Sequence, residues 1–511
     1  MKQKTIIQSI IIISLFIVPN LLAQNYSSAD PYYLLKNEKK QFSQYAQKPE
    51  LDSIPKYFHT QVIRPFYTPI ENKPFSIRLR NEQYYNENAP NQENMDIKYI
   101  GAGNGWYTGY NISFYSNFLA FTVEPYLLRN ENKDFEPIER SRPFTHLNDV
   151  RIHDKEGYID SGFREAMIYL HYKGFGVGYG SNNMWWGPGL HSSLTMSNNT
   201  IGFPHYSLGT LHDIRIKKWG INTKAILGYL NEETGNDAIY FSALYGIFSY
   251  YSNPVISLGL TRQFISGGVE LDGYTWGPEK ALELLYDDLF RQDIQGTKPY
   301  LTGSGHDPWD QFLIGYISMS FPASGLLLFL EYGTHDHRFS YGDLITEPDH
   351  ATGSIIGFRK YGMFENPNLF FVFEYANLIR GRYHIHRGSA NWYEKSHYDD
   401  LSYLGRRWAA HSGSDSDDFL LMFGLLNDRF VFLPGFNYER HGMINFRVPE
   451  VKMEFRLDAR YKYKDVWFNL YYEYQHEQHL GFTKDNVFFD EATGTRFTNT
   501  IMFGIEKQLY F

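Results

Sequence analysis

The stretch from residue 379 to residue 418 combines flat aromatic rings with arginines. An aromatic face packs against the C–H face of a sugar ring, and a planar guanidinium offers a fork of donors to hydroxyl or carboxylate oxygens. This composition indicates a carbohydrate-binding loop, although the same residues could form a membrane-interface girdle and an arginine network inside a barrel. The residues concerned are Tyr383, Trp392, Tyr393, Tyr398, Tyr403, Trp408, Arg380, Arg382, Arg387, Arg406 and Arg407.

Two adjacent arginines are the main binding candidates in this stretch. Arg406 and Arg407 lie directly before a tryptophan, and the formal net charge of the whole chain is -9. An acidic polymer would therefore be attracted only by cations gathered within a Debye length of about 8 Å. We predict that this pair contacts acidic sugars. The alternative is that it braces the fold against Asp415, Asp417 and Asp418.

A second aromatic pair precedes a tight bend. Trp185 and Trp186 are followed by Gly187-Pro188-Gly189. Indole rings could bind a sugar, but a Gly-Pro-Gly bend beside two indoles can also lock a loop onto the body of the protein. The structural role is favoured for this pair, and both tryptophans stay on the list of binding candidates.

Metal and catalytic chemistry are not expected. The pairs His335-Asp336-His337 and His384-Ile385-His386 each place two imidazoles on one strand face, but two ligands do not complete a metal site. The loop 265–310 has nine acidic against three basic residues, without the spacing of a calcium loop. Cysteine is absent, and no G-x-S-x-G nucleophile motif occurs. We therefore predict no cofactor, no metal site and no enzyme activity.

The composition of the 511 residues restricts the class of protein. The chain is 18% aromatic, which excludes a disordered protein. Its mean hydropathy is -0.43. After the first two dozen residues, no apolar run reaches the roughly eighteen residues that a membrane-spanning helix needs. No basic tract is present that could follow a phosphate backbone, so nucleic acid is not an expected partner.

Residues 1–23 have the pattern of a Sec signal peptide. Lys2 and Lys4 precede an apolar region from Ile6 to Val18, and Ala23 suits the last position before a cleavage site. Export out of the cytoplasm is therefore expected. Removing the two lysines takes the formal net charge from -9 to -11.

Strict alternation of apolar and polar residues predicts strands with two different faces. From Val451 to Tyr463 every second residue is apolar, and all the residues between them are charged. After the turn Lys464-Asp465 the alternation resumes, and the last strand of the chain ends on the aromatic Phe511, as in bacterial outer-membrane barrels. A hairpin in a soluble sandwich would show the same alternation.

Connection lengths favour a membrane barrel over a sandwich. Short turns at 464–465, 427–428, 365–368, 322–324, 252–254, 217–218, 173–174 and 116–117 alternate with the long loops 476–496, 439–450, 379–418, 335–352, 265–310, 231–238, 183–205 and 129–162. Tight periplasmic turns and long outer loops are typical of outer-membrane proteins. We predict an all-β fold, a transmembrane antiparallel β-barrel of about 18 strands, with both termini in the periplasm.

Two segments do not fit the strand period. Residues 24–93 contain a predicted helix with Asp30 as N-cap and Pro31 in its first turn, and we assign them to an N-terminal periplasmic or plug segment. Residues 279–293 show helical spacing within one outer loop, and we expect them to form a helix over the outer mouth. The barrel itself is assigned to residues 94–511. Both segments could occlude a lumen that a barrel of this size would otherwise leave open.

Two motifs resemble the Wzi family of capsule-assembly outer-membrane proteins. The first runs through Trp185-Trp186-Gly187-Pro188-Gly189, Ser192-Ser193-Leu194 and Ser197-Asn198-Asn199. The second runs through Trp392, His397-Tyr398, Gly405-Arg406 and Gly413-Ser414-Asp415-Ser416-Asp417, and Asp310-Gln311 is a weaker third match. The resemblance covers roughly residues 95–511. It implies an outer-membrane lectin with an 18-stranded barrel that anchors exported capsular polysaccharide.

We therefore predict a non-catalytic outer-membrane barrel that binds capsular or exopolysaccharide. Its expected partners are the polymer, outer-membrane lipid and the polysaccharide export machinery. A solute channel and a lipid-modifying barrel enzyme are the alternatives. The candidate binding residues are Trp185, Trp186, Trp392, His397, Tyr398, Arg406, Arg407 and Trp408, and the candidate structural positions are Gly187, Pro188, Gly189, Ser193, Asn198, Asn199, Gly413, Asp415 and Asp417.

Overall fold

The computed structural model describes residues 23–27, 31–46, 58–60, 62–70, 75–91, 93–153, 155–230, 238–268, 276–290, 309–335, 345–382, 388–393, 398, 401–482 and 494–511. Nearly all of the expected signal peptide, residues 1–23, lies outside this set. Among the described residues, no helix has the length and apolar character needed to span a membrane.

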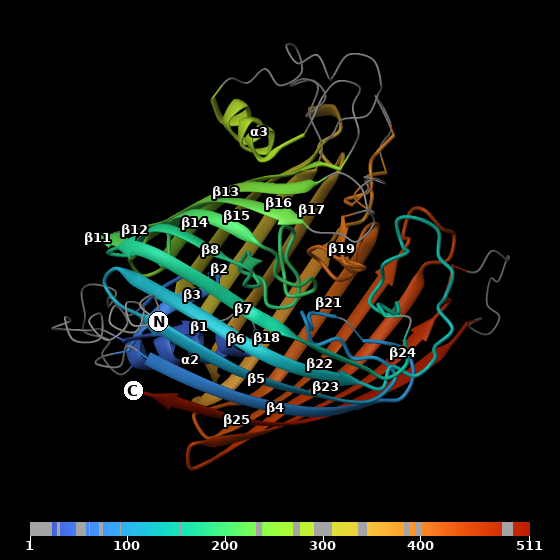
Figure 1. Ribbon diagram of the computed structural model, residues 1–511, viewed down its shortest axis with the longest axis horizontal. Coiled ribbons are helices and arrows are strands. Elements are labelled where there is room, and N and C mark those ends of the chain that lie inside the picture. The colour runs from blue at the N-terminus through green and yellow to red at the C-terminus, as the bar shows by residue number, and fades with distance from the viewer. Residues whose placement is uncertain are drawn as a thin grey trace, which may run out of the picture.

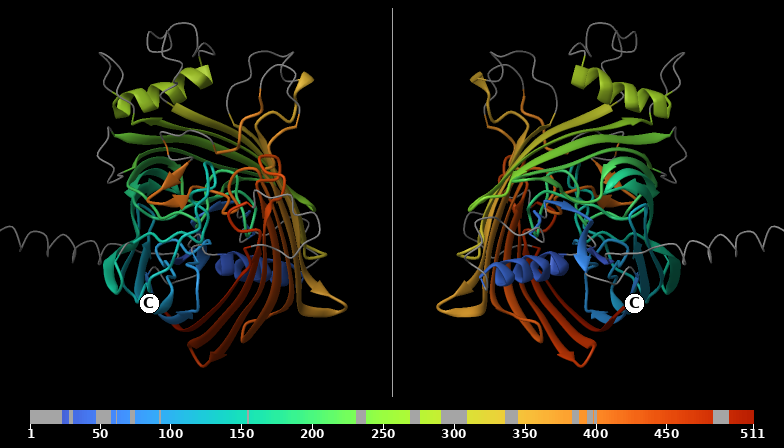
Figure 2. Two further views of the ribbon diagram at one scale, coloured as in Figure 1. Left: turned by 90° about the vertical axis from the view of Figure 1, so that its right-hand side faces the viewer. Right: turned by 90° about the vertical axis from the view of Figure 1, so that its left-hand side faces the viewer.

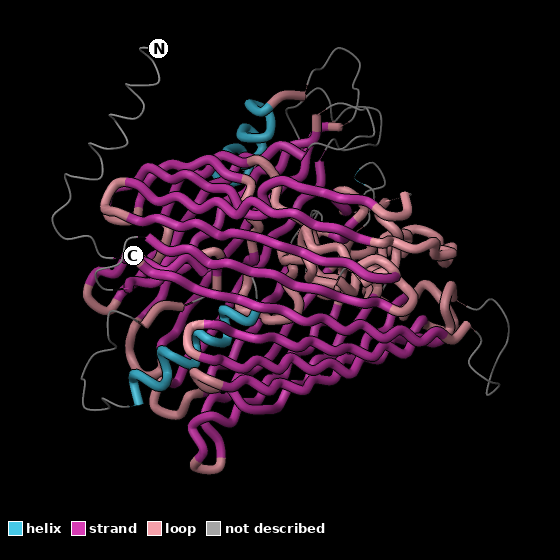
Figure 3. The backbone as a smooth tube through the Cα atoms, turned by 60° about the horizontal axis from the view of Figure 1, so that its bottom comes forward, coloured by secondary structure: helices cyan, strands magenta, loops and turns pink. Residues whose placement is uncertain are grey.

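The described chain forms a closed antiparallel β-barrel (Figure 1, Figure 3). It has eighteen strands within the described residues when β10 and β11, which both pair with β12, are counted as one. The predicted fold class and strand number are confirmed. The strands are β4 (Phe75–Asn86), β5 (Gly103–Tyr115), β6 (Leu119–Asn130), β7 (Tyr158–Tyr172), β8 (Phe175–Gly180), β10 (His205–Thr210), β11 (Ile214–Ile216), β12 (Trp219–Leu230), β13 (Ile239–Tyr250), β14 (Val255–Gly267), β15 (Trp309–Phe321), β16 (Leu326–His335), β17 (Thr352–Met363), β18 (Asn366–Asn377), β21 (Ser416–Leu426), β22 (Phe430–His441), β23 (Glu450–Tyr463), β24 (Val466–Gln478) and β25 (Arg496–Tyr510).

Three small two-stranded sheets accompany the barrel. They pair β1 (Ala23–Ser27) with β3 (Phe66–Ile70), β2 (Ile63–Arg64) with β9 (Trp185–Trp186), and β19 (Ser402–Tyr403) with β20 (Arg406–Arg407). Because β2 and β9 lie far apart in sequence, their pairing connects the N-terminal segment to the loop 183–205, which contains Trp185 and Trp186.

The alternation in the sequence gives the barrel wall two faces. On β23, Lys452 and Glu454 are buried, whereas the next residue, Phe455, is 55% exposed. On β25, Phe503 and Ile505 are likewise exposed. An outward apolar face suits lipid, and an inward polar face needs partners in the lumen.

The two ends of the barrel differ in the length of their connections (Figure 1). Lys464 and Asp465 alone join β23 to β24 at one end, with Lys464 at a φ of 54°. The pairing of the last strand with the first also ends here, where the backbone N–H of Phe511 donates to the carbonyl of Phe75 at 2.9 Å. The long loops lie at the opposite end. The predicted separation of short and long connections is confirmed.

The barrel begins earlier in the chain than expected. β4 (Phe75–Asn86) pairs with β25 on one side and β5 on the other, so the boundary predicted at residue 94 is wrong. Its inward residues include the buried Arg78, Arg80 and Glu82. Charged residues at these positions did not suggest a buried strand face in the sequence. Such charges are stable inside the barrel only where the lumen supplies partners, which the sequence alone does not show.

The predicted N-terminal helix is α2 (Pro31–Ala46), and it lies inside the barrel near the short-turn end (Figure 2). It begins at Pro31 as predicted, while the proposed N-cap Asp30 is outside the described residues. Tyr33 donates a 2.6 Å hydrogen bond to Glu506 of β25, and Glu38 pairs with Arg359 of β17 at 2.8 Å. The helix is therefore held by polar contacts to the barrel wall.

The second helix, α3 (Pro278–Phe290), does not cover the outer mouth. Its Leu284 and Leu285 pack with Phe264, Trp276 and Trp309, and Tyr240 and Leu244 lie against this cluster. The strand residues of this cluster, Phe264, Trp309, Tyr240 and Leu244, alternate along β13–β15 with residues that face the lumen. They therefore point outward, and α3 lies against the outside of the wall (Figure 1). The expectation of an occluding helix at 279–293 is wrong, because its apolar stripe is buried on the outward face of β13–β15.

The contact between α2 and the wall predicts a stability effect. Both side chains of the Arg359–Glu38 ion pair are buried. Arg359→Ala therefore leaves the buried Glu38 carboxylate without its cation and should lower the free energy of unfolding by about 3–5 kcal/mol. The temperature at which folded barrel converts to the slower-migrating form on a detergent gel measures this. Lys218→Ala, at an exposed position in the turn between β11 and β12, is the control and should cost less than about 1 kcal/mol. Equal shifts for the two variants would contradict the assignment, and Glu38→Gln should restore part of the stability lost in Arg359→Ala.

Candidate functional site

The predicted binding residues that the structure describes all lie in the interior of the barrel. None is more than 6% exposed, and His397 is outside the described residues. A polymer at the outer surface cannot contact them in this arrangement. The seven buried residues are Trp185, Trp186, Trp392, Tyr398, Arg406, Arg407 and Trp408.

The Gly-Pro-Gly bend is held by an arginine from the N-terminal segment. Arg64 lies over the ring of Trp185, with 4.5 Å from its Cζ to the ring centroid. Its Nη2 donates to the carbonyl of Gly189 at 2.6 Å and to that of Gly187 at 3.3 Å. Burial and the nearby Arg359 guanidinium lower the pKa of Arg64 to about 9. The predicted locking role of this bend agrees with these contacts.

Two glutamates of the barrel wall hold the loop that follows. Glu374 of β18 accepts hydrogen bonds from the backbone N–H groups of Leu190, His191 and Ser192, at 2.7, 3.1 and 2.7 Å. Glu331 of β16 accepts a hydrogen bond from the backbone N–H of Leu194 at 3.1 Å. Each carboxylate satisfies loop donors that would otherwise be buried without partners. The loop 183–205 is thus anchored to the wall.

The two sequence motifs meet inside the lumen. Ser197 Oγ donates to the carbonyl of Ala409 at 2.5 Å, and Asn199 Nδ2 donates to that of Arg407 at 3.0 Å. Trp408 stacks on Phe203, with ring centroids 5.3 Å apart. The motif residues therefore pack two outer loops against each other, and the aromatic rings serve this packing.

The acidic residues at 415–418 have partners other than the arginine pair. Asp415 accepts the backbone N–H groups of Ile444 and Asn445, both at 2.8 Å, and Asp417 pairs with Arg440. Arg407 donates to the carbonyl of Pro143 at 2.6 Å. Burial lowers the pKa of Arg406, whose strongest attractive neighbour is Asp96. These contacts give both arginines a place in the lumen filling.

A compact group of titratable side chains lies beside these loops. His191 and His411 face Glu93 and Asp418, with four nitrogen–oxygen distances between 3.2 and 3.4 Å. All four residues are buried. Burial alone would lower the pKa of His411, but the Glu93 and Asp418 carboxylates outweigh it and raise that pKa to about 9.

Sequence reasoning missed this group because its members are distant in the chain. The H-x-H pairs singled out instead do not form it. His335 pairs with Asp310 at 2.5 Å, and His337 and the pair His384-Ile385-His386 lie outside the described residues. The available signal was position, since His191 lies within the first motif and His411 within the second.

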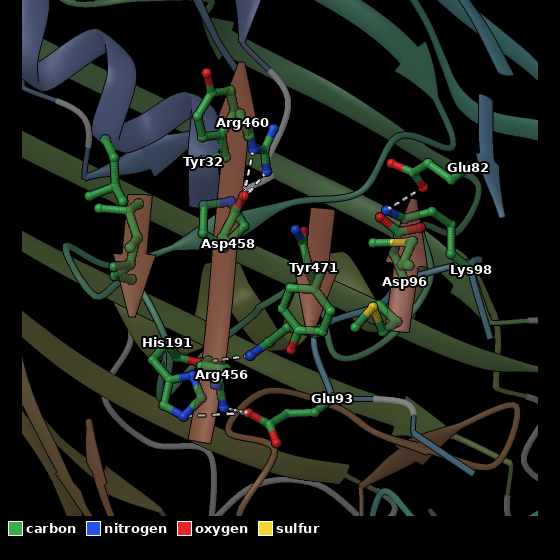
Figure 4. Close-up of a pocket in the computed structure, with 18 of the residues that line it drawn as sticks. Tyr32, Glu82, Glu93, Asp96, Lys98, His191, Arg456, Asp458, Arg460 and Tyr471 are labelled. Carbon is green, nitrogen blue, oxygen red and sulfur yellow. Dashed lines mark hydrogen bonds and ion pairs between the residues drawn. The ribbon is translucent and has the colours of Figure 1, made fainter. Parts of the chain in front are cut away.

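A cavity of about 190 Å³ lies in the lumen between α2 and the packed loops (Figure 4). Glu93, His191 and Arg456 surround one part of it, and Asp458 and Arg460 line another. Arg456 pairs with Glu93 at 3.0 Å. Ligand pockets for small molecules usually measure about 300–1,000 Å³, so this charged cavity suits ions or water rather than a sugar chain.

The bend itself predicts a sensitive position. Gly187 has a φ of 129°, and an added Cβ would lie 1.9 Å from Glu331 Oε1. Gly187→Ala should therefore destabilise the fold by at least about 1–3 kcal/mol, seen as a lower unfolding temperature and faster proteolysis of loop 183–205. Gly246→Ala is the matched control, because nothing lies within 4 Å of its added Cβ. Unchanged stability of Gly187→Ala would refute the described seating of this loop.

Comparisons with known proteins agree with this architecture. A solved structure described as Wzi, an outer-membrane protein of Escherichia coli involved in group 1 capsule assembly and a carbohydrate-binding β-barrel, aligns with a TM-score of 0.57 and 10% identity. The alignment covers 96% of this chain and 99% of that one. A second structure, OccK7 (OpdD) of Pseudomonas aeruginosa, has a TM-score of 0.44 and 10% identity over 86% of this chain and 100% of its own.

No curated protein matches the chain. The family model for the capsule assembly protein Wzi, however, matches residues 84–488, which is more than half of the sequence. The chain therefore belongs to the Wzi capsule-assembly family.

Proposed function

We propose that this protein binds exported capsular or exopolysaccharide at the outer face of the outer membrane and anchors it there without catalysis. Membership of the capsule-assembly family supports the process, and the similar E. coli protein is described as carbohydrate-binding. Residues 1–23 support Sec export. The outward apolar face places the barrel in lipid, and the export machinery that delivers the polymer is a further proposed partner.

The observation that carries this proposal is the filled lumen. α2 occupies the short-turn half through its contacts with Glu506 and Arg359, and the loops 183–205 and 401–415 pack together in the other half. A barrel of this size with an empty interior would conduct solutes. The filling argues against the channel alternative and leaves the outer loops as the functional surface.

The outer surface offers arginines other than the main predicted pair, Arg406 and Arg407. Arg382 and Arg447 are exposed and come from the two neighbouring loops after β18 and β22. Beneath them Arg380 donates to Asn445 Oδ1 at 3.0 Å, and Asn445 donates to Asn391 Oδ1 at 3.1 Å. These bonds hold the two loops in a fixed relation, which makes their exposed guanidinium groups suitable for acidic sugars.

The described residues also bear on the enzyme alternative. Ser192 Oγ lies 3.5 Å from His411 Nδ1, but both residues are fully buried within the lumen. Ser192 Oγ instead donates to Asp418 Oδ2 at 3.1 Å. A lipid substrate could not approach Ser192 without removal of the packed loops. Its hydrogen bond to Asp418 of β21 instead helps to anchor loop 183–205 to the wall.

A double variant tests the proposed contact surface. Each exposed ion pair contributes about 0.5–1 kcal/mol, so Arg382→Ala with Arg447→Ala should weaken binding of acidic capsular polymer about five- to thirtyfold, with a smaller loss at high salt. Binding of purified polymer to the folded barrel measures this. Arg429→Ala with Lys464→Ala removes the same charge at the short-turn end and should leave binding unchanged. Equal losses in both variants would contradict a specific outer surface.

Planar-bilayer recording tests the sealed lumen. We expect conductance near zero for the intact protein, and openings after Glu331→Ala with Glu374→Ala, because these carboxylates hold loop 183–205 to the wall. Deleting 279–290 is the control and should leave conductance low, since α3 lies outside the barrel. Steady large openings in the intact protein would restore the channel interpretation.

A further inference from the structure

The four buried residues Glu93, His191, His411 and Asp418 bring two imidazole nitrogens and two carboxylate oxygens together. Glu93 Oε1 lies 3.4 Å from the Nε2 atoms of both histidines. Asp418 Oδ2 lies 3.4 Å from His191 Nε2 and 3.2 Å from His411 Nε2. The donor atoms of Glu93, His191 and His411 all fall within 4.8 Å of one another.

These distances fit coordination better than hydrogen bonding. Ligand atoms at about 2.0–2.1 Å from a tetrahedral ion lie about 3.3–3.4 Å from each other, and the four nitrogen–oxygen distances given above are close to this length. A charge-assisted N–H···O bond would be shorter, at about 2.7–2.9 Å. Glu93, His191 and His411 thus converge on a common centre, and Asp418 lies beside both histidines.

The orientation of His411 gives an independent indication. Its Nε2 is buried and makes no hydrogen bond within the described part of the chain, although it faces two carboxylates. A buried ring nitrogen without a hydrogen bond is costly, and a cation that replaces its proton and takes its lone pair would satisfy it. A cation between the two carboxylates would be that partner.

The buried carboxylates around the site also favour a cation. Among the described residues, the carboxylates Glu93, Glu439, Glu454 and Glu473 pair with the two permanently charged cations Lys452 and Arg456, whereas Asp418 pairs with His191 and His411. Uncompensated charge is expensive in a buried site. The remaining partners within the described contacts are histidines, among them His441 beside Glu439.

We propose that Glu93, His191, His411 and Asp418 bind one divalent transition-metal cation of the Zn²⁺ type. Two imidazoles and two carboxylates are a donor set that suits Zn²⁺ and its neighbours better than Ca²⁺ or Mg²⁺, which prefer oxygen ligands alone. Glu93 and His191 line the 190 Å³ cavity, which gives an ion access to the site (Figure 4).

The surrounding polar groups form a second layer around the ion. Lys452 and Arg456 bind Glu93 at 2.9 and 3.0 Å and orient its carboxylate. Asn437 Nδ2 lies 3.0 Å from His191 Nε2 and also donates to Asp418 Oδ1, so a cation bound at His191 would have to displace this amide. Its Oδ1 has no hydrogen bond among the described residues, and rotation frees that oxygen to accept one.

Such an ion would join the plug to the barrel wall. Glu93 lies between β4 and β5, His191 in the loop after β9, His411 in the loop after β20, and Asp418 on β21. Four protein ligands leave no open coordination position, so the site is structural. The metal would lock the three lumen-filling segments to a membrane strand.

Metal uptake by the folded detergent-solubilised barrel tests the proposal. After treatment with EDTA and equilibration with Zn²⁺, elemental analysis should find one Zn²⁺ per chain, and Zn²⁺ should raise the unfolding temperature. His191→Gln with His411→Gln should lose both effects. His335→Gln is the control, because His335 is a buried histidine that pairs with Asp310 outside this cluster, and this variant should keep the Zn²⁺ response.

Measurements on the unaltered protein keep the test independent of variant folding. Co²⁺ bound at this site should give the intense visible absorption of a tetrahedral complex, and Zn²⁺ should displace it. Absence of stoichiometric Zn²⁺ binding, or an unchanged response in the double variant, would overturn the proposal, as would uptake of Ca²⁺ alone. Because none of these readouts involves polymer, they are separate from tests of polysaccharide binding.

Discussion

The structure depends on one constraint, which is that a sheet crossing a bilayer must leave no backbone N–H or C=O group unpaired in lipid. The pairing of β25 with β4 meets this requirement, because it removes the two free edges of the sheet. Closure of eighteen strands then creates a second requirement, since a ring of this size encloses more space than its own side chains fill. The organisation of the interior follows from that space.

Buried charges organise the filling of the lumen. Glu38 on α2 pairs with Arg359 on the wall, and the wall carboxylates Glu331 and Glu374 accept backbone donors of loop 183–205. A buried charge is tolerated only where such partners are present, so each contact specifies where its segment must lie. The inward charged faces of β4 and β23 are therefore the surfaces of the barrel wall against which the lumen-filling segments pack. The proposed cation among Glu93, His191, His411 and Asp418 would extend the same principle to a charge that side chains alone do not balance.

This interior changes how the aromatic and arginine-rich motifs are understood. Trp186 and Trp408 offer the ring surface that sugar binding uses, yet both are almost fully buried and pack with Tyr245 and Phe203. An aromatic ring packs equally well on a sugar or on another ring, so composition could not separate these roles. In the function proposed above, the exposed Arg382 and Arg447 of the outer loops would contact the polymer, while the motif residues pack inside the lumen.

The sequence by itself determined the barrel, because side-chain alternation with a period of two is a local property that lipid and lumen impose on every strand. The turn at Lys464-Asp465, the terminal Phe511 and the helix starting at Pro31 were predictable for the same reason. Only the tertiary structure decided that Phe75–Asn86 is a strand, that α3 lies outside the wall, and that Arg406 and Arg407 point into the lumen. It also brought together Glu93, His191, His411 and Asp418. These outcomes depend on the direction in which loops fold and on partners hundreds of residues away, which no local pattern records.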